Sequence, residues 1–324
     1  MKVCFIIPYF GKLPDYFRIF LKTCSYNKRF QWLLVTDSVI EYQLPANVQI
    51  VSMSFPDLIK LVNARMGFET ALDRPYKLCD FKPAYGYIFE NYLSGYDFWG
   101  HCDIDTVMGN LSSFLTYDLL VKYDKLFCMG HFVLYRNTFD NNRVFMRPLN
   151  GLLLYKNVFL SNEIMTFDEE WNGKNNINQI YLSNGLSVYQ TDLSANLSVW
   201  YQDFRTTTYF IDSCTGEIDF QTEPSSNSLF IWDRGDLFRL TNNNGNLIRR
   251  DYMYLHHQWR DMKYDSSLLK SSCFKIVPNY FKPIRKLPSS IQEFEHEKKK
   301  YLNTYYLSLF YRTKVKPRLS KFSN

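Results

Sequence analysis

The chain has 324 residues and a formal charge of +6, and its 46% hydrophobic and 22% charged residues exclude a disordered protein. Its seven scattered cysteines form no C-x-x-C pair, which excludes a zinc ribbon or disulfide framework and predicts a reducing, cytoplasmic setting. No stretch approaches the ~20 apolar residues that cross a bilayer, and no nucleic-acid-binding signature is present. We therefore expect a soluble or peripheral protein that does not bind nucleic acid.

The apolar pattern of residues 1–105 predicts strands that alternate with helices. Continuously apolar runs indicate buried strands at 3–7, 32–35 and 48–53, and a fourth strand that ends at residues 101–105. Helices are expected at 14–26, 58–66 and 80–93, with Ser54 as the N-cap of the second. This alternation predicts an α/β fold with a mixed, mostly parallel sheet flanked by helices, and ligands bound beyond the carboxyl ends of its strands. Residues 1–105 are thus the expected nucleotide-binding half.

We expect the remainder of the chain to form an acceptor-side half at 106–265 and a basic helical appendage at 266–324. Shorter strands are expected in the acceptor half at 126–135, 152–154, 186–189, 209–211 and 229–232. In the appendage, apolar residues recur at helical spacing between lysines and arginines: Tyr301, Leu302, Tyr305, Tyr306, Leu309 and Phe310. Such a helix can lie on an anionic membrane surface, beside a lipid-linked acceptor at the inner face of the membrane. The alternative is a helix packed on the domain with a solvated basic tail.

Asp103-Ile104-Asp105, at the end of the predicted fourth strand, is the sharpest chemical feature. In a strand, residues two apart point to the same side, so both carboxylates converge where the chain leaves the sheet. Paired carboxylates suit Mg²⁺ or Mn²⁺ bound together with substrate phosphates. The alternative is a solvated loop that caps the turn at Gly109-Asn110.

Several segments resemble an incompletely characterised family of bacterial glycosyltransferases found in capsular and surface-polysaccharide gene clusters. The similar segments are Ile6 to Gly11, Cys79 to Gly86, Gly95 to Asp105, Gly130 to Asn137 and Tyr252 to Arg260. The resemblance spans about residues 1 to 262. It implies a GT-A fold for the domain at 1–265, a nucleotide-sugar donor and metal-dependent transfer.

The resemblance also implies a ligand set for the metal. Asp105 matches the aspartate that binds the metal directly in GT-A enzymes. Asp103 matches the aspartate that contacts the donor ribose or the metal. A histidine near the end of the domain often completes such sites, and the family's tail pattern assigns this role to His256. His257 follows directly in this sequence and leaves the choice between the two histidines open.

Besides Asp103, five residues are expected to contact the donor. Lys82 and Asp80 lie at a predicted helix start, where the helix dipole favours phosphate, and the resemblance implies donor contacts for both; Asp80 is alternatively an N-cap. Tyr9 and Asp37 follow the first and second strands, where GT-A folds hold the base and ribose, although both also suit turns. Arg260 offers a guanidinium for the diphosphate, or is a solvated surface arginine.

Asp168 and Glu169 are the candidate catalytic residues on the acceptor side. An inverting transferase needs a carboxylate to accept the proton of the acceptor hydroxyl, whereas a retaining one does not. The alternative is an acidic helix start, and Asp192 is a weaker candidate base.

The predicted function is transfer of a hexose from a nucleotide-diphosphate sugar, with UDP preferred, to a hydroxyl of a surface or capsular polysaccharide precursor. Two rival functions remain open. One is a nucleotidyltransferase, which also uses paired aspartates and a metal, although no Gly-rich phosphate loop lies near the N-terminus. The other is a catalytically inactive carbohydrate- or nucleotide-binding protein of the same fold.

Overall fold

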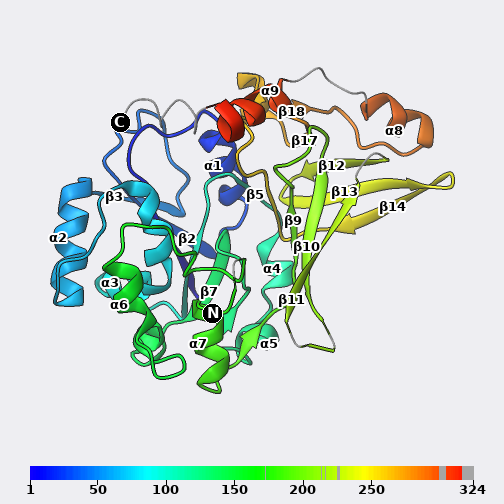
Figure 1. The fold of residues 1–324 in the computed structure, drawn as a ribbon. Coiled ribbons are helices and arrows are strands. Elements are labelled where there is room, and N and C mark those ends of the chain that lie inside the picture. The colour runs from blue at the N-terminus through cyan, green and yellow to red at the C-terminus, as the bar shows by residue number, and fades with distance from the viewer. Residues whose placement is uncertain (172, 213, 216, 225–226, 299–303, 316–324) are drawn as a thin grey trace.

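The computed structural model describes residues 1–171, 173–212, 214–215, 217–224, 227–298 and 304–315. The fold is mixed α/β, with a large, mostly parallel sheet and flanking helices (Figure 1). Within the described ranges, no helix is long and apolar enough to cross a membrane.

A seven-stranded sheet forms the centre of the first part of the chain. Its strands are, in spatial order, β3 (Val48–Ser52), β2 (Phe30–Thr36), β1 (Val3–Pro8), β4 (Phe98–Cys102), β7 (Phe132–Arg136), β6 (Lys125–Leu126) and β8 (Val188–Tyr189). The first four strands are parallel, β7 is antiparallel to β4 and to β6, and β8 is parallel to β6. The carboxyl ends of β1, β2 and β4 therefore lie at one edge of the sheet.

Helices cover both faces of this sheet because its central strands are apolar on both sides. In β1, Cys4 and Ile6 belong to one core, while Val3, Phe5 and Ile7 belong to the other. The first core includes α2 (Phe55–Met66), η1 (Pro75–Ala84), α3 (Tyr85–Ile88), η3 (Asn141–Met146), α6 (Leu154–Phe159) and α7 (Ile177–Ser183). The second includes α1 (Phe17–Ser25), α4 (Leu111–Phe114) and α5 (Tyr117–Leu120).

A second, β-rich part packs beside the first through a three-stranded sheet of β5 (Thr106–Met108), β15 (Tyr254–His256) and β9 (Ser194–Asn196). A third core joins α1 to this small sheet and to a six-stranded sheet. The latter contains, in order, β14 (Asn246–Asp251), β13 (Asp236–Asn243), β12 (Ser228–Asp233), β17 (Cys273–Val277), β18 (Tyr280–Pro283) and β16 (Lys263–Tyr264). The remaining elements are the hairpin of β10 (Arg205–Ile211) and β11 (Ile218–Pro224), η2 (Glu90–Tyr92), η4 (Ser266–Lys270), α8 (Ile291–Glu297) and α9 (Tyr305–Phe310), which continues as η5 (Tyr311–Val315).

The local signals of the first 70 residues are confirmed. The three expected strands and the helix after Pro14 are present, and Ser54 caps α2 by accepting a hydrogen bond from the backbone N–H of Asp57 at 3.2 Å. The expected helix at 80–93 is instead broken into η1, α3 and η2, with Pro83 inside the first piece. Proline has no N–H to donate and clashes with the preceding turn, so a continuous α-helix does not form there.

Three expectations for the second part are wrong. Residues 126–135 form two strands, because the chain turns between them with a positive φ of 71° at Phe127. Residues 152–154 are not a strand, since α6 begins at Leu154. The segment from 266 is not a helical appendage throughout, because β17 pairs with β12 and β18 pairs with β17 in the six-stranded sheet. In addition, β7, β6 and β8 come from the expected acceptor half yet complete the first sheet.

Candidate metal centre

Asp103, Asp105 and His256 lie together at the carboxyl end of β4. One ligand atom from each side chain lies within 4.8 Å of the others. The two aspartates occupy a bend between β4 and β5 rather than a strand, and the hydroxyl of Thr106 holds the bend by donating to the carbonyl of Asp103 at 2.7 Å. His256 arrives from β15, which pairs antiparallel with β5 and aligns His256 with Thr106.

The donor atoms of this cluster fit a divalent cation. Asp105 Oδ1 is buried and accepts no hydrogen bond within the described part of the chain, and Nε2 of His256 lies 3.3 Å from it. The other ring nitrogen, Nδ1, lies 3.0 Å from Oδ1 of Asn196, which also accepts from Gln258 at 2.8 Å. Nδ1 is thus the donor of the imidazole, and the lone pair of Nε2 faces a carboxylate oxygen. Two such lone pairs repel each other unless a proton or a metal ion lies between them.

The mutual contact of Asp105 and His256 shifts the pKa of each side chain. Burial alone raises the pKa of Asp105, but the adjacent imidazole outweighs this and leaves the pKa below its ordinary value. Burial likewise lowers the pKa of His256, while the Asp105 carboxylate reverses the shift and raises the pKa. The site therefore stabilises a positive charge between these two side chains.

The geometry favours His256 over His257 as the ligand. The ring of His257 packs edge-on against Tyr16, with centroids 4.7 Å apart, and burial lowers its pKa to about 4. Its backbone N–H donates to the carbonyl of Asp105 at 3.0 Å, so His257 supports the bend through its main chain. His131 packs behind His256 with ring centroids 4.4 Å apart, and its Nδ1 lies 2.9 Å from the hydroxyl of Tyr254.

Lys82 connects the cluster to the predicted acceptor-side acids. Its ammonium lies 2.8 Å from Asp103 Oδ1 and 3.4 Å from Asp168 Oδ2, and it donates to the carbonyl of Gly130 at 2.9 Å. Burial lowers the pKa of Lys82, but the carboxylates of Asp103 and Asp168 outweigh it and hold the pKa well above its usual range. Burial raises the pKa of Asp168 to about 8, with Lys82 opposing the shift and Glu169 adding to it.

Gly130 is the residue that lets these acids approach the main chain. A Cβ at this position would lie 2.2 Å from Asp168 Oδ2 and 3.2 Å from Glu169 Oε2. The backbone N–H of Gly130 donates to the same Glu169 oxygen at 3.2 Å. Residues 167–171 form a turn rather than an acidic helix start. The carboxylate of Asp192, the weaker candidate base, accepts hydrogen bonds from the backbone N–H and hydroxyl of Ser194 and from the backbone N–H of Tyr209.

The structure corrects the role expected for Asp80. Its side chain is fully buried, and Oδ2 lies 2.7 Å from the ammonium of Lys77. The same carboxylate accepts the backbone N–H groups of Met165 at 2.9 Å and Phe167 at 3.0 Å. Because both oxygens are bonded inside the protein, Asp80 cannot contact a nucleotide, and instead anchors the segment that carries Asp168.

Arg260 is likewise a structural residue rather than a diphosphate contact. It is 1% exposed, and its guanidinium donates to the carbonyls of Ser198, Tyr201, Gln202 and Asp203. The ring of Tyr305 covers it, with the guanidinium carbon 4.1 Å from the ring centroid. Arg260 therefore fastens the loop at 198–203 and helix α9 to the segment after β15.

Tyr9 and Asp37 lie beyond the carboxyl ends of β1 and β2, as expected. The hydroxyl of Tyr9 donates to the carbonyl of Lys12 at 3.3 Å, and Asp37 Oδ1 accepts the N–H of Gly11 at 3.0 Å. Both residues therefore shape the loop after β1. Burial, and then the charge of Asp105, raise the pKa of Tyr9.

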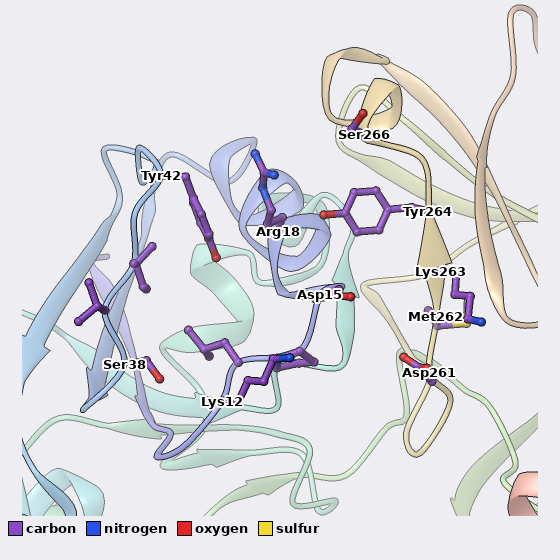
Figure 2. A pocket seen from close by; sticks show the side chains of 14 residues that line it. Lys12, Asp15, Arg18, Ser38, Tyr42, Asp261, Met262, Lys263, Tyr264 and Ser266 are labelled. Atoms are coloured by element: carbon purple, nitrogen blue, oxygen red, sulfur yellow. The ribbon is translucent and has the colours of Figure 1, made fainter.

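A pocket of about 740 Å³ opens next to this loop. Figure 2 shows Arg18 between Tyr42 and Tyr264, with Lys12 and Asp261 at the other end of the cavity. The guanidinium of Arg18 lies 4.9 Å from the ring centroid of Tyr42. The full lining is Lys12, Leu13, Pro14, Asp15, Arg18, Ser38, Val39, Ile40, Tyr42, Asp261, Met262, Lys263, Tyr264 and Ser266.

Tyr16 connects the pocket to the metal cluster. It follows the lining residue Asp15, and its ring packs edge-on against His257, whose backbone N–H donates to the carbonyl of Asp105. Burial, and then the charges of Asp105, Tyr9 and Asp261, raise the pKa of Tyr16. The sequence reasoning missed this pocket. Asp261 and Lys263 follow the His256 motif directly, which was a usable signal, whereas nothing local marks the aromatic ring of Tyr264 as facing Arg18.

Comparison with known proteins gives a family but no activity. A search against curated proteins produced no match. Residues 5–285, well over half of the chain, match a family described as a family of unknown function, DUF6625. The chain therefore belongs to DUF6625.

Proposed function

We propose that this protein is a metal-dependent glycosyltransferase of the GT-A type. It transfers a hexose from a nucleotide-diphosphate sugar, with UDP as the preferred nucleotide, to a hydroxyl of a surface or capsular polysaccharide precursor. The observation that carries the proposal is the Asp103–Asp105–His256 cluster at the carboxyl end of a central strand, with a large pocket beside it. In open α/β sheets this edge is where ligands bind.

The nucleoside of the donor would occupy the pocket. Its volume of about 740 Å³ lies within the range of small-molecule sites, and its aromatic and cationic lining suits a base, a ribose and an anionic phosphate. Arg18 and Lys12 supply positive charge, and Tyr42 supplies a ring for stacking. Because Tyr16 follows the lining residue Asp15 and packs against His257, which bonds to Asp105 through its main chain, the diphosphate would extend from this pocket toward the metal cluster.

Asp103, Asp105 and His256 would hold Mn²⁺ or Mg²⁺ against the diphosphate. The cation, when bound, neutralises charge that develops on the diphosphate as the glycosidic bond breaks. Lys82, paired with Asp103 at 2.8 Å, adds a second positive group at the same place. Asn196 fixes the imidazole of His256 so that Nε2 points at Asp105.

Asp168 and Glu169 would face the acceptor hydroxyl. Burial raises the pKa of both carboxyl groups, which makes each a better proton acceptor near neutral pH than an exposed carboxylate. Asp168 is 3% exposed and pairs with Lys82, whereas Glu169 is the more accessible of the two. We therefore assign the base role of an inverting reaction to Glu169 and a positioning role, through Lys82, to Asp168.

A thermal-shift panel with UDP, GDP and CMP, each with and without Mn²⁺, tests this proposal. One nucleotide should raise the melting temperature, and more so with metal, because a ligand that binds the folded state alone stabilises it. Asp105→Ala should abolish the metal-dependent part. A donor-hydrolysis screen with nucleotide sugars then separates an active transferase from an inactive binding protein, and pyrophosphate release would instead indicate a nucleotidyltransferase. No stabilisation by any nucleotide with Mn²⁺ would contradict the proposal.

A further inference from the structure

Helix α9 is held on the domain by one of its faces. Tyr305 and Leu309 are buried, at 5% and 7% exposure. The hydroxyl of Tyr305 donates to the carbonyl of Val199 at 2.9 Å, and its ring covers Arg260. The orientation of α9 on the protein is therefore fixed by contacts that leave its opposite face outward.

The outward face carries large apolar side chains. Tyr306, Leu307, Phe310 and the first residue of η5, Tyr311, are 59%, 68%, 53% and 52% exposed. Tyr306 and Phe310 are four residues apart, as are Leu307 and Tyr311, so each pair shares a face and the two pairs form neighbouring rows. We call this surface the α9 face. Contiguous exposed apolar surface of this kind marks a site of interaction with a protein or a membrane.

Further exposed aromatic residues lie on the segments that hold α9. Trp200 is 59% exposed and follows Val199, which accepts the hydrogen bond from Tyr305. Trp259 is 48% exposed and precedes Arg260, which Tyr305 covers. Figure 1 shows α9 at one end of the molecule, above α1 and next to β18. Aromatic side chains that combine an apolar ring with a polar atom favour the interface between lipid and water.

The positive charge of the chain is concentrated in the part of the sequence that contains α9. From Lys298 to Asn324 the sequence holds eight Lys or Arg residues and no Asp or Glu. Because the whole chain carries +6 and this segment +8, residues 1–297 carry −2. Among the described residues of the segment, Lys314 is exposed just beyond the apolar stripe. The basic residues of the sequence thus precede and follow the apolar residues of α9.

We infer that the α9 face docks this protein on an anionic lipid surface. Tyr306, Leu307, Phe310 and Tyr311 enter the boundary between headgroups and acyl chains, with the exposed Lys314 at the headgroups. The other basic residues of the sequence after Lys298 add to the attraction for an anionic surface. A partner protein would need a groove both apolar and acidic, whereas an anionic bilayer offers both properties everywhere. Each cation near such a surface strengthens binding roughly fivefold, an effect that salt weakens.

The docking surface is coupled to the candidate site by the chain itself. Arg260, beneath Tyr305, lies four residues after His256. If the proposed function holds, the metal centre stands close to the membrane, where a lipid-linked glycan acceptor would be. Vesicle binding requires neither metal nor nucleotide, so this inference and the proposed function succeed or fail in separate experiments.

Co-sedimentation of the full-length protein with vesicles tests the inference. We expect at least tenfold tighter binding to vesicles of phosphatidylglycerol and phosphatidylcholine than to phosphatidylcholine alone, and weaker binding at high salt. The double variant Leu307→Glu/Phe310→Glu should lose at least tenfold in affinity. The control Tyr117→Glu/Leu160→Glu changes the charge equally at two other exposed positions, which are 67% and 59% exposed, and should retain most of the binding.

Because all four substitutions lie on the surface, the variants should fold like the wild type, which circular dichroism checks. Failure of the wild-type protein to bind anionic vesicles would overturn the inference and leave the α9 face to a protein partner. Equal binding of both double variants would also overturn it, since the lipid contact would then lie elsewhere.

Discussion

Replacing Asp80 by asparagine removes the counter-charge of a buried lysine. Both side chains of the Lys77–Asp80 pair are 0% exposed, and the ammonium lies 2.7 Å from Oδ2. Asparagine has nearly the same shape, so the substitution changes charge and hydrogen bonding rather than volume. The carboxylate also accepts the N–H groups of Met165 and Phe167, and these charge-assisted bonds become weaker neutral ones.

The expected loss in the free energy of unfolding is about 3–5 kcal/mol, the usual cost of leaving one member of a buried ion pair without its partner. A loss of about 3 kcal/mol lowers the ratio of folded to unfolded molecules more than a hundredfold. The double variant Lys77→Met/Asp80→Asn removes both charges and should be more stable than Asp80→Asn alone. Such recovery would identify the uncompensated ammonium as the cause.

Urea unfolding followed by circular dichroism measures these differences. Asp73→Asn is the matched control, since Asp73 pairs with Arg74 on the surface at 50% and 44% exposure and should change stability by less than about 1 kcal/mol. If Asp80→Asn were as mild as this control, Asp80 would not be a buried structural anchor. The reasoning that removed it from the donor site would then be refuted.

Three further substitutions test other parts of the site. Gly130→Ala brings a Cβ to 2.2 Å from Asp168 Oδ2 and should slow transfer roughly 100-fold. The control Gly86→Ala brings a Cβ equally close to the core tryptophan Trp99, and should lower stability but leave the transfer kinetics intact. Arg260→Ala leaves buried carbonyls without donors and should cost at least about 3 kcal/mol of unfolding free energy; unchanged stability would return Arg260 to the list of phosphate contacts. Arg18→Ala should weaken UDP binding about tenfold by calorimetry, and an unchanged Kd would exclude the nucleoside from this pocket.

Local signals explain which parts of the fold the sequence predicted. The apolar runs of β1, β2 and β3 and the cap at Ser54 depend on neighbouring residues, and all four features are present. The strand β17 was missed because its pairing with β12 depends on contacts far apart in the sequence, and β18 extends the same sheet by pairing with β17. The residue types in this segment did not distinguish its strands from the basic helical tail that follows it in the sequence.

The candidate site shows the same division. Asp103 and Asp105 were found from their spacing, but it is a bend, not strand alternation, that makes them converge. The partnership with His256 came from resemblance, since β15 is placed beside β5 by tertiary pairing. Charge could not reveal that Asp80 and Arg260 are buried, because the main-chain groups that bond to their side chains lie 57 to 87 residues away in the chain.

Manganese binding to the Asp103–Asp105–His256 cluster tests the central claim most directly. Electron paramagnetic resonance can count bound Mn²⁺ in the presence of UDP for the wild type, for Asp105→Asn and for Asp118→Asn, an exposed acid on α5. We predict one bound ion for the wild type and for Asp118→Asn, and an affinity at least tenfold lower for Asp105→Asn. Equal Mn²⁺ affinity in all three proteins would contradict the account.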